Sequence, residues 1–220
     1  MQRLKIDVYS DVICPWCYLG KKRLEAALTS LGENVQPEVR FLPYELNPST
    51  PEEGLDHKAH LAAKFGGVHA LDAAHARLAA LGKEAGIDYQ FDSIRKTPNT
   101  FNAHRVLWLA EKEGKGNEAH NAFFKAYFTD GKDLGDKKVL ADLAVSIGLD
   151  KPEVEKLLAG HEGEEEVRAA EEKAYDLGVS GVPFFVFNDK FAVSGAQSVE
   201  TFGKALVKAL EHGLDQAAPL

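Results

Sequence analysis

The sequence predicts an α/β fold in which a βαβ unit and an αββα unit flank a large all-helical insertion. Two apolar strand-like segments lie near the N-terminus and two more near the C-terminus, whereas Ala, Leu, Lys and Glu dominate the stretch between them. We expect residues 1–48 and 164–213 to form one discontinuous α/β domain. Residues 49–163 should form the helical insertion, and residues 214–220 a C-terminal tail.

The N-terminal unit follows from three periodic segments. Alternating apolar residues at positions 4–10 predict a strand, and residues 19–31 carry an apolar stripe that predicts an amphipathic helix. Gly32 is well placed to end that helix. Residues 35–43 predict a second strand, which completes the order β, α, β.

The insertion contains no segment with a convincing strand pattern between residues 52 and 160. Glycines separate its expected helices, and no fixed repeat period is present. These helices are expected at residues 56–65, 70–85, 99–113, 118–129, 137–147 and 152–158.

The C-terminal unit begins with a charged amphipathic helix at residues 162–177. Residues 184–187 and 190–193 predict two strands, and residues 199–210 predict a final helix. The two-residue connection Asn188-Asp189 permits only antiparallel pairing, so the two strands should form a hairpin.

The chain contains two cysteines, and the segment Cys14-Pro15-Trp16-Cys17 holds both of them directly after the first strand. At a helix start, unpaired N–H groups and the helix dipole favour an anion, and this setting lowers the pKa of a thiol. Two intervening residues place the second sulfur one turn on, where it can attack a mixed disulfide. The spacing therefore indicates dithiol–disulfide exchange, with Cys14 as exposed nucleophile and Cys17 as buried resolving thiol of higher pKa. Pro15 and Trp16 should tune the redox potential.

Other roles for the cysteine pair have weaker support. A disulfide closing so short a loop would stabilise little, and a zinc or iron–sulfur site normally needs four ligands. His57-x-x-His60 offers two nitrogens, but it lies far along the chain, and we expect its histidines to be solvated. We expect no metal site, although a cluster shared by two chains through Cys14 stays open. A non-enzymatic module whose CxxC senses redox state or binds metal stays open as well.

Composition restricts the partners and the compartment. The formal net charge of −8 disfavours nucleic acid and anionic membrane as partners. No apolar run reaches membrane-spanning length, and the first residues run straight into a strand without a signal-peptide core. We therefore expect a cytoplasmic protein, in which a lone CxxC is more plausibly catalytic than structural.

Further motifs point to a known family. Gly181-Val182-Pro183 precedes the third strand and resembles the cis-proline loop of the thioredoxin superfamily. Together with the CxxC and the helical insertion, it makes the chain similar to the DsbA-like branch of that superfamily. Asn99-Thr100-x-x-Ala103-His104-Arg105 and Gly195-Ala196-Gln197 resemble FrnE-type dithiol oxidoreductases and the related 2-hydroxychromene-2-carboxylate isomerases.

The resemblance implies a thioredoxin-like fold with a helical insertion and a dithiol–disulfide oxidoreductase or isomerase that needs no bound cofactor. It implies a cis bond between Val182 and Pro183, with the backbone there pairing with substrate. It also implies that Asn99 and His104 lie beside the CxxC and contact substrate or glutathione. The alternative, that these two residues merely cap and decorate an ordinary helix, stays open.

Three departures from the relatives matter for function. The isomerases and the kappa-class glutathione transferases carry serine where this chain has Cys14, so Cys14 favours redox chemistry. Some FrnE-like proteins carry a second cysteine pair, which is absent here. Periplasmic DsbA has histidine at the position of Trp16, so we expect a less oxidising couple.

We therefore expect a cytosolic reductase or isomerase of protein or small-molecule disulfides. Its partners would be disulfide-containing proteins or small thiols, with glutathione as candidate co-substrate. The alternative enzyme is a glutathione-dependent isomerase or transferase acting on an aromatic or polyketide-like substrate.

Overall fold

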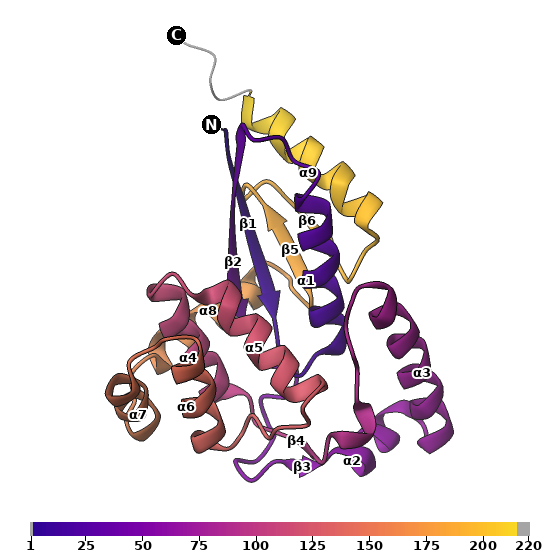
Figure 1. The fold of residues 1–220 in the computed structure, drawn as a ribbon, viewed down its shortest axis with the longest axis vertical. Helices are drawn as coiled ribbons and strands as arrows, with labels where there is room; N and C mark the ends of the chain where they lie inside the picture. The colour runs from indigo at the N-terminus through magenta and orange to yellow at the C-terminus, as the bar shows by residue number, and fades with distance from the viewer. Residues whose placement is uncertain (1, 215–220) are drawn as a thin grey trace.

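The computed structural model describes the backbone of residues 2–214 and the side chains of residues 2–211. A four-stranded sheet with the order β2-β1-β5-β6 forms its centre (Figure 1). Strand β1 is parallel to β2 and antiparallel to β5, which pairs antiparallel with β6 in the expected hairpin. The strands are β1 (Gln2–Ser10), β2 (Val35–Pro43), β5 (Phe184–Phe187) and β6 (Phe191–Ser194).

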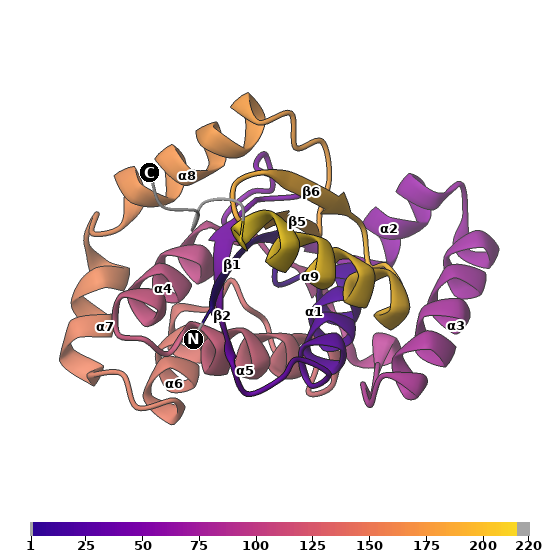
Figure 2. The ribbon, with the colours of Figure 1, turned by 90° about the horizontal axis from the view of Figure 1, so that it is seen from above.

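Helices cover both faces of the sheet. Helices α1 (Pro15–Leu28) and α9 (Val199–Leu214) lie side by side on one face, as Figure 2 shows. Alternate residues of β1 point into the core that these helices share with the sheet. These residues are Leu4, Ile6 and Val8. On the opposite face, Tyr9 of β1 packs with Ala174 of helix α8 (Glu164–Asp176).

The insertion consists mainly of helices, as expected. Its hydrophobic core includes Cys14, Cys17, Tyr18 and Leu19, so that core is continuous with the first turns of α1. The helices are α2 (His57–Phe65), α3 (Val68–Glu84), α4 (Phe101–Lys112), α5 (Gly116–Phe128), α6 (Lys137–Ser146) and α7 (Lys151–Ala159), with a 3₁₀ turn at Phe91–Ser93.

The expectation that the insertion lacks strands is wrong in one place. Strands β3 (Leu55–Asp56) and β4 (Lys96–Thr97) pair antiparallel and hold the two ends of the α2–α3 segment together. Each has two residues, which is too short for an alternating pattern to be recognised in the sequence.

Element boundaries also differ from expectation. Helix α1 begins at Pro15 rather than at residue 19, because Cys14 is its N-cap and proline suits the first helical position. The domain limits 1–48, 49–163 and 164–213 stay predictions. Of the expected tail, residue 214 ends α9, and residues 215–220 lie outside the described residues. Within the described chain, no helix is both long enough and apolar enough to cross a bilayer.

Candidate active site

The CPWC segment forms the N-terminal turn of α1. Cys14 is the N-cap, with an extended backbone (φ −91°, ψ 113°), and its N–H donates to the carbonyl of Asp11 over 3.0 Å. The N–H of Cys17 donates to the carbonyl of Cys14, also over 3.0 Å. Both cysteines are free thiols. This geometry places Cys14 at the helix end, where N–H groups lack intrahelical partners, and places Cys17 one turn further in.

Both sulfurs are buried, which the sequence analysis expected for Cys17 but not for Cys14. The exposed fraction is 4% for Cys14 and 2% for Cys17, so the expectation of an exposed Cys14 is wrong. The reason is the insertion, whose core packs against the start of α1. Burial first, and then the adjacent Cys14 thiol, raise the pKa of Cys17 well above its ordinary value. Cys17 therefore stays protonated at neutral pH, as a resolving thiol should.

The loop before β5 lies directly against the first cysteine. The peptide bond between Val182 and Pro183 is cis. The Cys14 thiol donates a hydrogen bond to the Val182 carbonyl over 3.6 Å. Gly20 of α1 lets Pro183 pack closely against the helix, since a Cβ on residue 20 would lie 3.0 Å from Cγ of Pro183. The structure thus brings together the two motifs that the sequence singled out, Cys14-Pro15-Trp16-Cys17 and Val182-Pro183.

Tyr89 is a site residue that the sequence analysis missed. Its hydroxyl donates to the carbonyl of Pro15 over 2.6 Å, inside the CPWC motif. Its ring packs edge-on against Tyr18, with centroids 5.9 Å apart. Gly82 makes room for that ring, because a Cβ there would fall 2.4 Å from a ring carbon of Tyr89. No local pattern marks this tyrosine as a site residue, because the Pro15 carbonyl to which it donates lies 74 residues away in the chain.

Asn99 lies at a helix start. Its Oδ1 accepts from the N–H of Phe101, where α4 begins, over 3.0 Å, and its Nδ2 donates to the Thr50 carbonyl over 2.9 Å. Asn99 and His104 are both absent from the residues that line the cavity at Cys14. Of the two interpretations of Asn99, the geometry favours the structural one.

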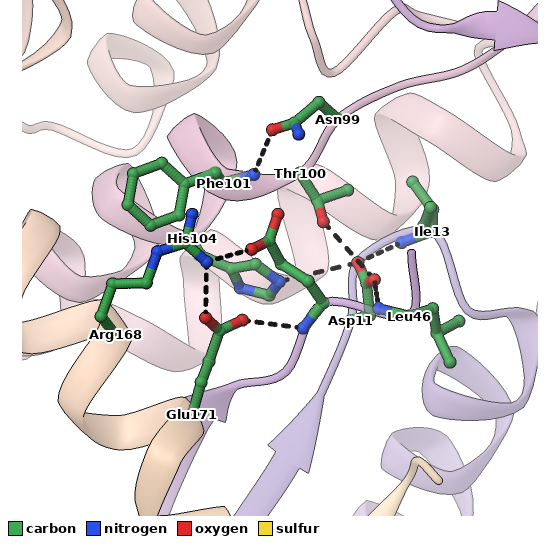
Figure 3. A network of polar contacts seen from close by, with 10 residues as sticks. Asp11, Ile13, Leu46, Asn99, Thr100, Phe101, His104, Arg168 and Glu171 are labelled. Carbon is green, nitrogen blue, oxygen red and sulfur yellow. Dashed lines mark hydrogen bonds and ion pairs between the residues drawn. The ribbon is translucent and has the colours of Figure 1, made fainter. Parts of the chain in front are cut away.

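His104 belongs to a buried polar network, shown in Figure 3. Its Nε2 lies 3.7 Å from Oδ1 of Asp11. Burial alone would lower the pKa of His104, but the Asp11 carboxylate and then the charges of Glu171 and Glu45 outweigh burial and raise it. The surrounding carboxylates thus offset the cost of burying a protonated imidazole at this position.

Asp11 connects this network to the cysteines. The carboxylate of this fully buried residue accepts from the N–H groups of Ile13 (3.3 Å) and Leu46 (2.8 Å) and lies 3.5 Å from the Thr100 hydroxyl. Because the Asp11 carbonyl accepts from the N–H of Cys14, the carboxylate and its partners fix the loop that delivers Cys14 to the helix.

Glu45, Arg168 and Glu171 extend the network outward. Arg168 Nη1 lies 3.0 Å from Glu171 Oε2 (Figure 3). It also lies 2.6 Å from Glu45 Oε2, and Glu171 Oε1 accepts from the Glu45 N–H. Burial, and then the charge of Glu171, raise the pKa of Glu45. These contacts join the loop after β2 to α8, and so they support the polar network around Asp11 and His104.

A cavity of about 470 Å³ opens beside Cys14, between the CPWC motif and helices α2 and α3. Pro15, Trp16 and Val182 line it together with Cys14. Trp16 has an exposed fraction of 36% and stands at this cavity. Within the described residues, no group of three or more histidine, cysteine or acidic side chains is arranged to hold a metal ion.

Comparison with known proteins agrees with this geometry. The probable DsbA oxidoreductase SCO1869 of Streptomyces coelicolor is 35% identical with a TM-score of 0.88, and the match covers 99% of this chain and 92% of that chain. The uncharacterized protein YwbO of Bacillus subtilis strain 168 is 29% identical over 202 residues, which are 91% of this chain and 94% of YwbO.

A 2-hydroxychromene-2-carboxylate isomerase shares the fold. Its structure has a TM-score of 0.71 at 18% identity, and the match covers 97% of this chain and 100% of that chain. The model of the DSBA-like thioredoxin domain matches residues 5–207. Since that match spans nearly the whole chain and both the sheet and the CPWC turn agree with it, the protein belongs to the DSBA-like thioredoxin domain family.

Proposed function

We propose that the protein is a cytoplasmic thiol–disulfide oxidoreductase that reduces or isomerises disulfides through Cys14 and Cys17. The observation that carries this proposal is the asymmetry of the two sulfurs. Cys14 caps α1 and lines a cavity, whereas Cys17 lies one turn deeper with its pKa raised by burial. Cys14 is thus available to attack a substrate, while Cys17 remains buried and protonated.

The exchange proceeds in two steps. The Cys14 thiolate attacks one sulfur of the substrate disulfide, an S–S bond forms between them, and the other half leaves as a thiolate. Cys17 then loses its proton and attacks Sγ of Cys14, which releases the second substrate thiolate and leaves a Cys14–Cys17 disulfide. Two electrons pass from the protein to the substrate, and the protein needs a thiol reductant to return to the dithiol.

The surrounding groups have separate roles in this scheme. The backbone at Val182 offers its carbonyl beside the Cys14 sulfur, where an extended substrate can align. Pro15 and Trp16 set the local environment of the thiolate and so its redox potential. Glutathione is the proposed reductant, and no bound cofactor is required. The proposed partners are disulfide-containing proteins or small thiols rather than nucleic acid or membrane.

Reduction of a disulfide substrate tests the proposal. Insulin and glutathione disulfide are offered to the protein with glutathione as reductant, and thiol release is followed for wild type, Cys14→Ser and Cys17→Ser. Loss of activity in both variants supports the proposal, with Ser30→Ala on the surface as control. Wild-type protein that reduces neither substrate contradicts it. Glutathione-dependent turnover of a substrate without a disulfide, surviving Cys17→Ala, would favour the isomerase or transferase alternative.

A further inference from the structure

We propose that the cavity beside Cys14 selects a small apolar disulfide that carries a carboxylate. The inference rests on the proposed function, because it specifies which disulfides reach the same two sulfurs. Three independent features of the cavity support it: the way it controls access to Cys14, its charge, and a buried histidine in its wall.

Access to the nucleophile runs through the cavity. Since Cys14 is only 4% exposed, a substrate disulfide reaches its sulfur through the cavity that Cys14 lines. The cavity that Cys14 lines has a volume of about 470 Å³, within the range of small-molecule sites. Its walls are mainly apolar, and they include Trp16 of α1, Leu61 and Phe65 of α2, and Leu78 of α3. These dimensions and surfaces suit one or two aromatic rings.

The charged side chains that line the cavity are positive, whereas the protein as a whole is negative. The chain carries a formal net charge of −8, yet no aspartate or glutamate lines the cavity. Lys64 of α2 and Arg77 of α3 both line it. Lys64 Nζ lies 3.5 Å from Oδ1 of the neutral Asn47, and within the described part of the chain neither cation has an ion-pair partner. Two unpaired cations beside an apolar surface attract an anionic group on a bound molecule.

A buried nitrogen without a partner points to a ligand independently. His57 lines the cavity, is 7% exposed, and its Nε2 has no hydrogen-bond partner among the described residues. Its Nδ1 is satisfied, since it lies 3.0 Å from Oγ1 of Thr97 and 3.4 Å from the Tyr127 hydroxyl. Nε2 is therefore the ring nitrogen that lacks a partner in the described structure, whichever of the two nitrogens carries the proton. A buried polar atom of this kind is normally satisfied, and a molecule in the cavity would satisfy it.

Single-turnover kinetics with pre-reduced protein tests this selection. The probes are bis(4-carboxyphenyl) disulfide, neutral 4,4′-dithiodipyridine and the aliphatic cationic disulfide cystamine. We expect the double variant Arg77→Gln and Lys64→Gln to lower the rate of reaction with the carboxylated probe at least tenfold. The rate with dithiodipyridine should fall less than twofold. Lys83→Gln makes the same charge change on an exposed position of α3 away from the cavity, and should leave all rates unchanged.

A second variant pair tests the volume of the cavity. Ala74→Leu places extra carbon atoms inside the cavity and should slow both aromatic probes at least tenfold, while Ala80→Leu on the exposed side of α3 should not. Melting temperatures of all variants establish that they fold.

The outcomes separate the inference from the proposed function. The inference is overturned if the charge variants change the rates with the carboxylated and neutral probes equally. It is also overturned if Ala74→Leu leaves the rates with both aromatic probes unchanged. Wild type that reduces insulin and cystamine faster than the carboxylated probe also overturns it, but leaves the proposed function standing. Wild type that reduces none of these disulfides overturns the proposed function itself.

Discussion

The hydroxyl of Tyr89 donates a hydrogen bond to the carbonyl oxygen of Pro15 over 2.6 Å, so the helical insertion directly supports the CPWC turn. Burial first, and then the charge of Cys14, raise the pKa of Tyr89, which keeps the hydroxyl protonated as a donor. The insertion therefore does more than cover the sulfurs, because it also fixes the backbone between them.

Loss of this hydrogen bond should be measurable as lost stability. Tyr89→Phe keeps the ring but leaves the Pro15 carbonyl without this donor, so the free energy of unfolding should fall by about 1 kcal/mol. Denaturant titration measures the change. Tyr175→Phe, at a side chain 52% exposed, is the control and should change little. Equal stability of wild type and Tyr89→Phe would show that this contact contributes nothing.

Two glycines in helices should respond in opposite directions to alanine. Gly82→Ala would place a Cβ 2.4 Å from the Tyr89 ring, so overpacking should lower the free energy of unfolding by about 1–3 kcal/mol. Gly203→Ala in α9 meets no atom within 4 Å and should raise it by up to about 1 kcal/mol through helix propensity. Thermal and denaturant unfolding of both variants test this. Stabilisation by Gly82→Ala would contradict the packing described for Tyr89.

Buried neutral histidines should make the protein sensitive to acid. Burial lowers the pKa of His120 from 6.5 to about 3. Between these values the unfolded chain binds a proton that the folded chain does not, so this residue's contribution to stability is lost as the pH falls through that window. The loss is at most about 1.4 kcal/mol per pH unit for one such group.

The variant His120→Phe isolates this effect. Phenylalanine should keep the stacking on Phe41, where the ring centroids are 4.2 Å apart, and removes the titrating group. The free energy of unfolding should then fall less steeply than in wild type between about pH 6 and pH 4. His161→Phe, at a side chain 91% exposed, should retain the wild-type slope. Identical slopes for His120→Phe and wild type would show that His120 does not titrate in this way.

The raised pKa of Cys17 predicts which thiol is alkylated. Limiting iodoacetamide near pH 7 should label Cys14, which lines the cavity, and leave Cys17 protonated and unlabelled. Labelling of Cys17 should increase only when the pH rises above the ordinary thiol range. Peptide mass mapping across pH measures both rates. Faster labelling of Cys17 at neutral pH would reverse the two roles.

The sequence predicts those parts of the fold and site that depend on local pattern. Strand β1, the CPWC turn and the β5–β6 hairpin each follow from periodicity or from a short motif, and the structure confirms them. The burial of Cys14 and the support from Tyr89 depend on contacts between distant segments, which leave no periodic signal. The interior position of His57 was missed for the same reason, since a polar helical segment gives no hint of what packs over it.

Trapping of a mixed disulfide tests the central claim most directly. Reduced Cys17→Ala is mixed with glutathione disulfide, and its intact mass and peptide map are recorded beside those of Cys14→Ala and wild type. We predict a stable glutathione adduct on Cys14 in Cys17→Ala, because no second thiol can release it. Wild type should instead lose two hydrogens and form the Cys14–Cys17 disulfide, and Cys14→Ala should stay unmodified under the same conditions. An adduct on Cys17 in Cys14→Ala, or no adduct in Cys17→Ala, would contradict the account.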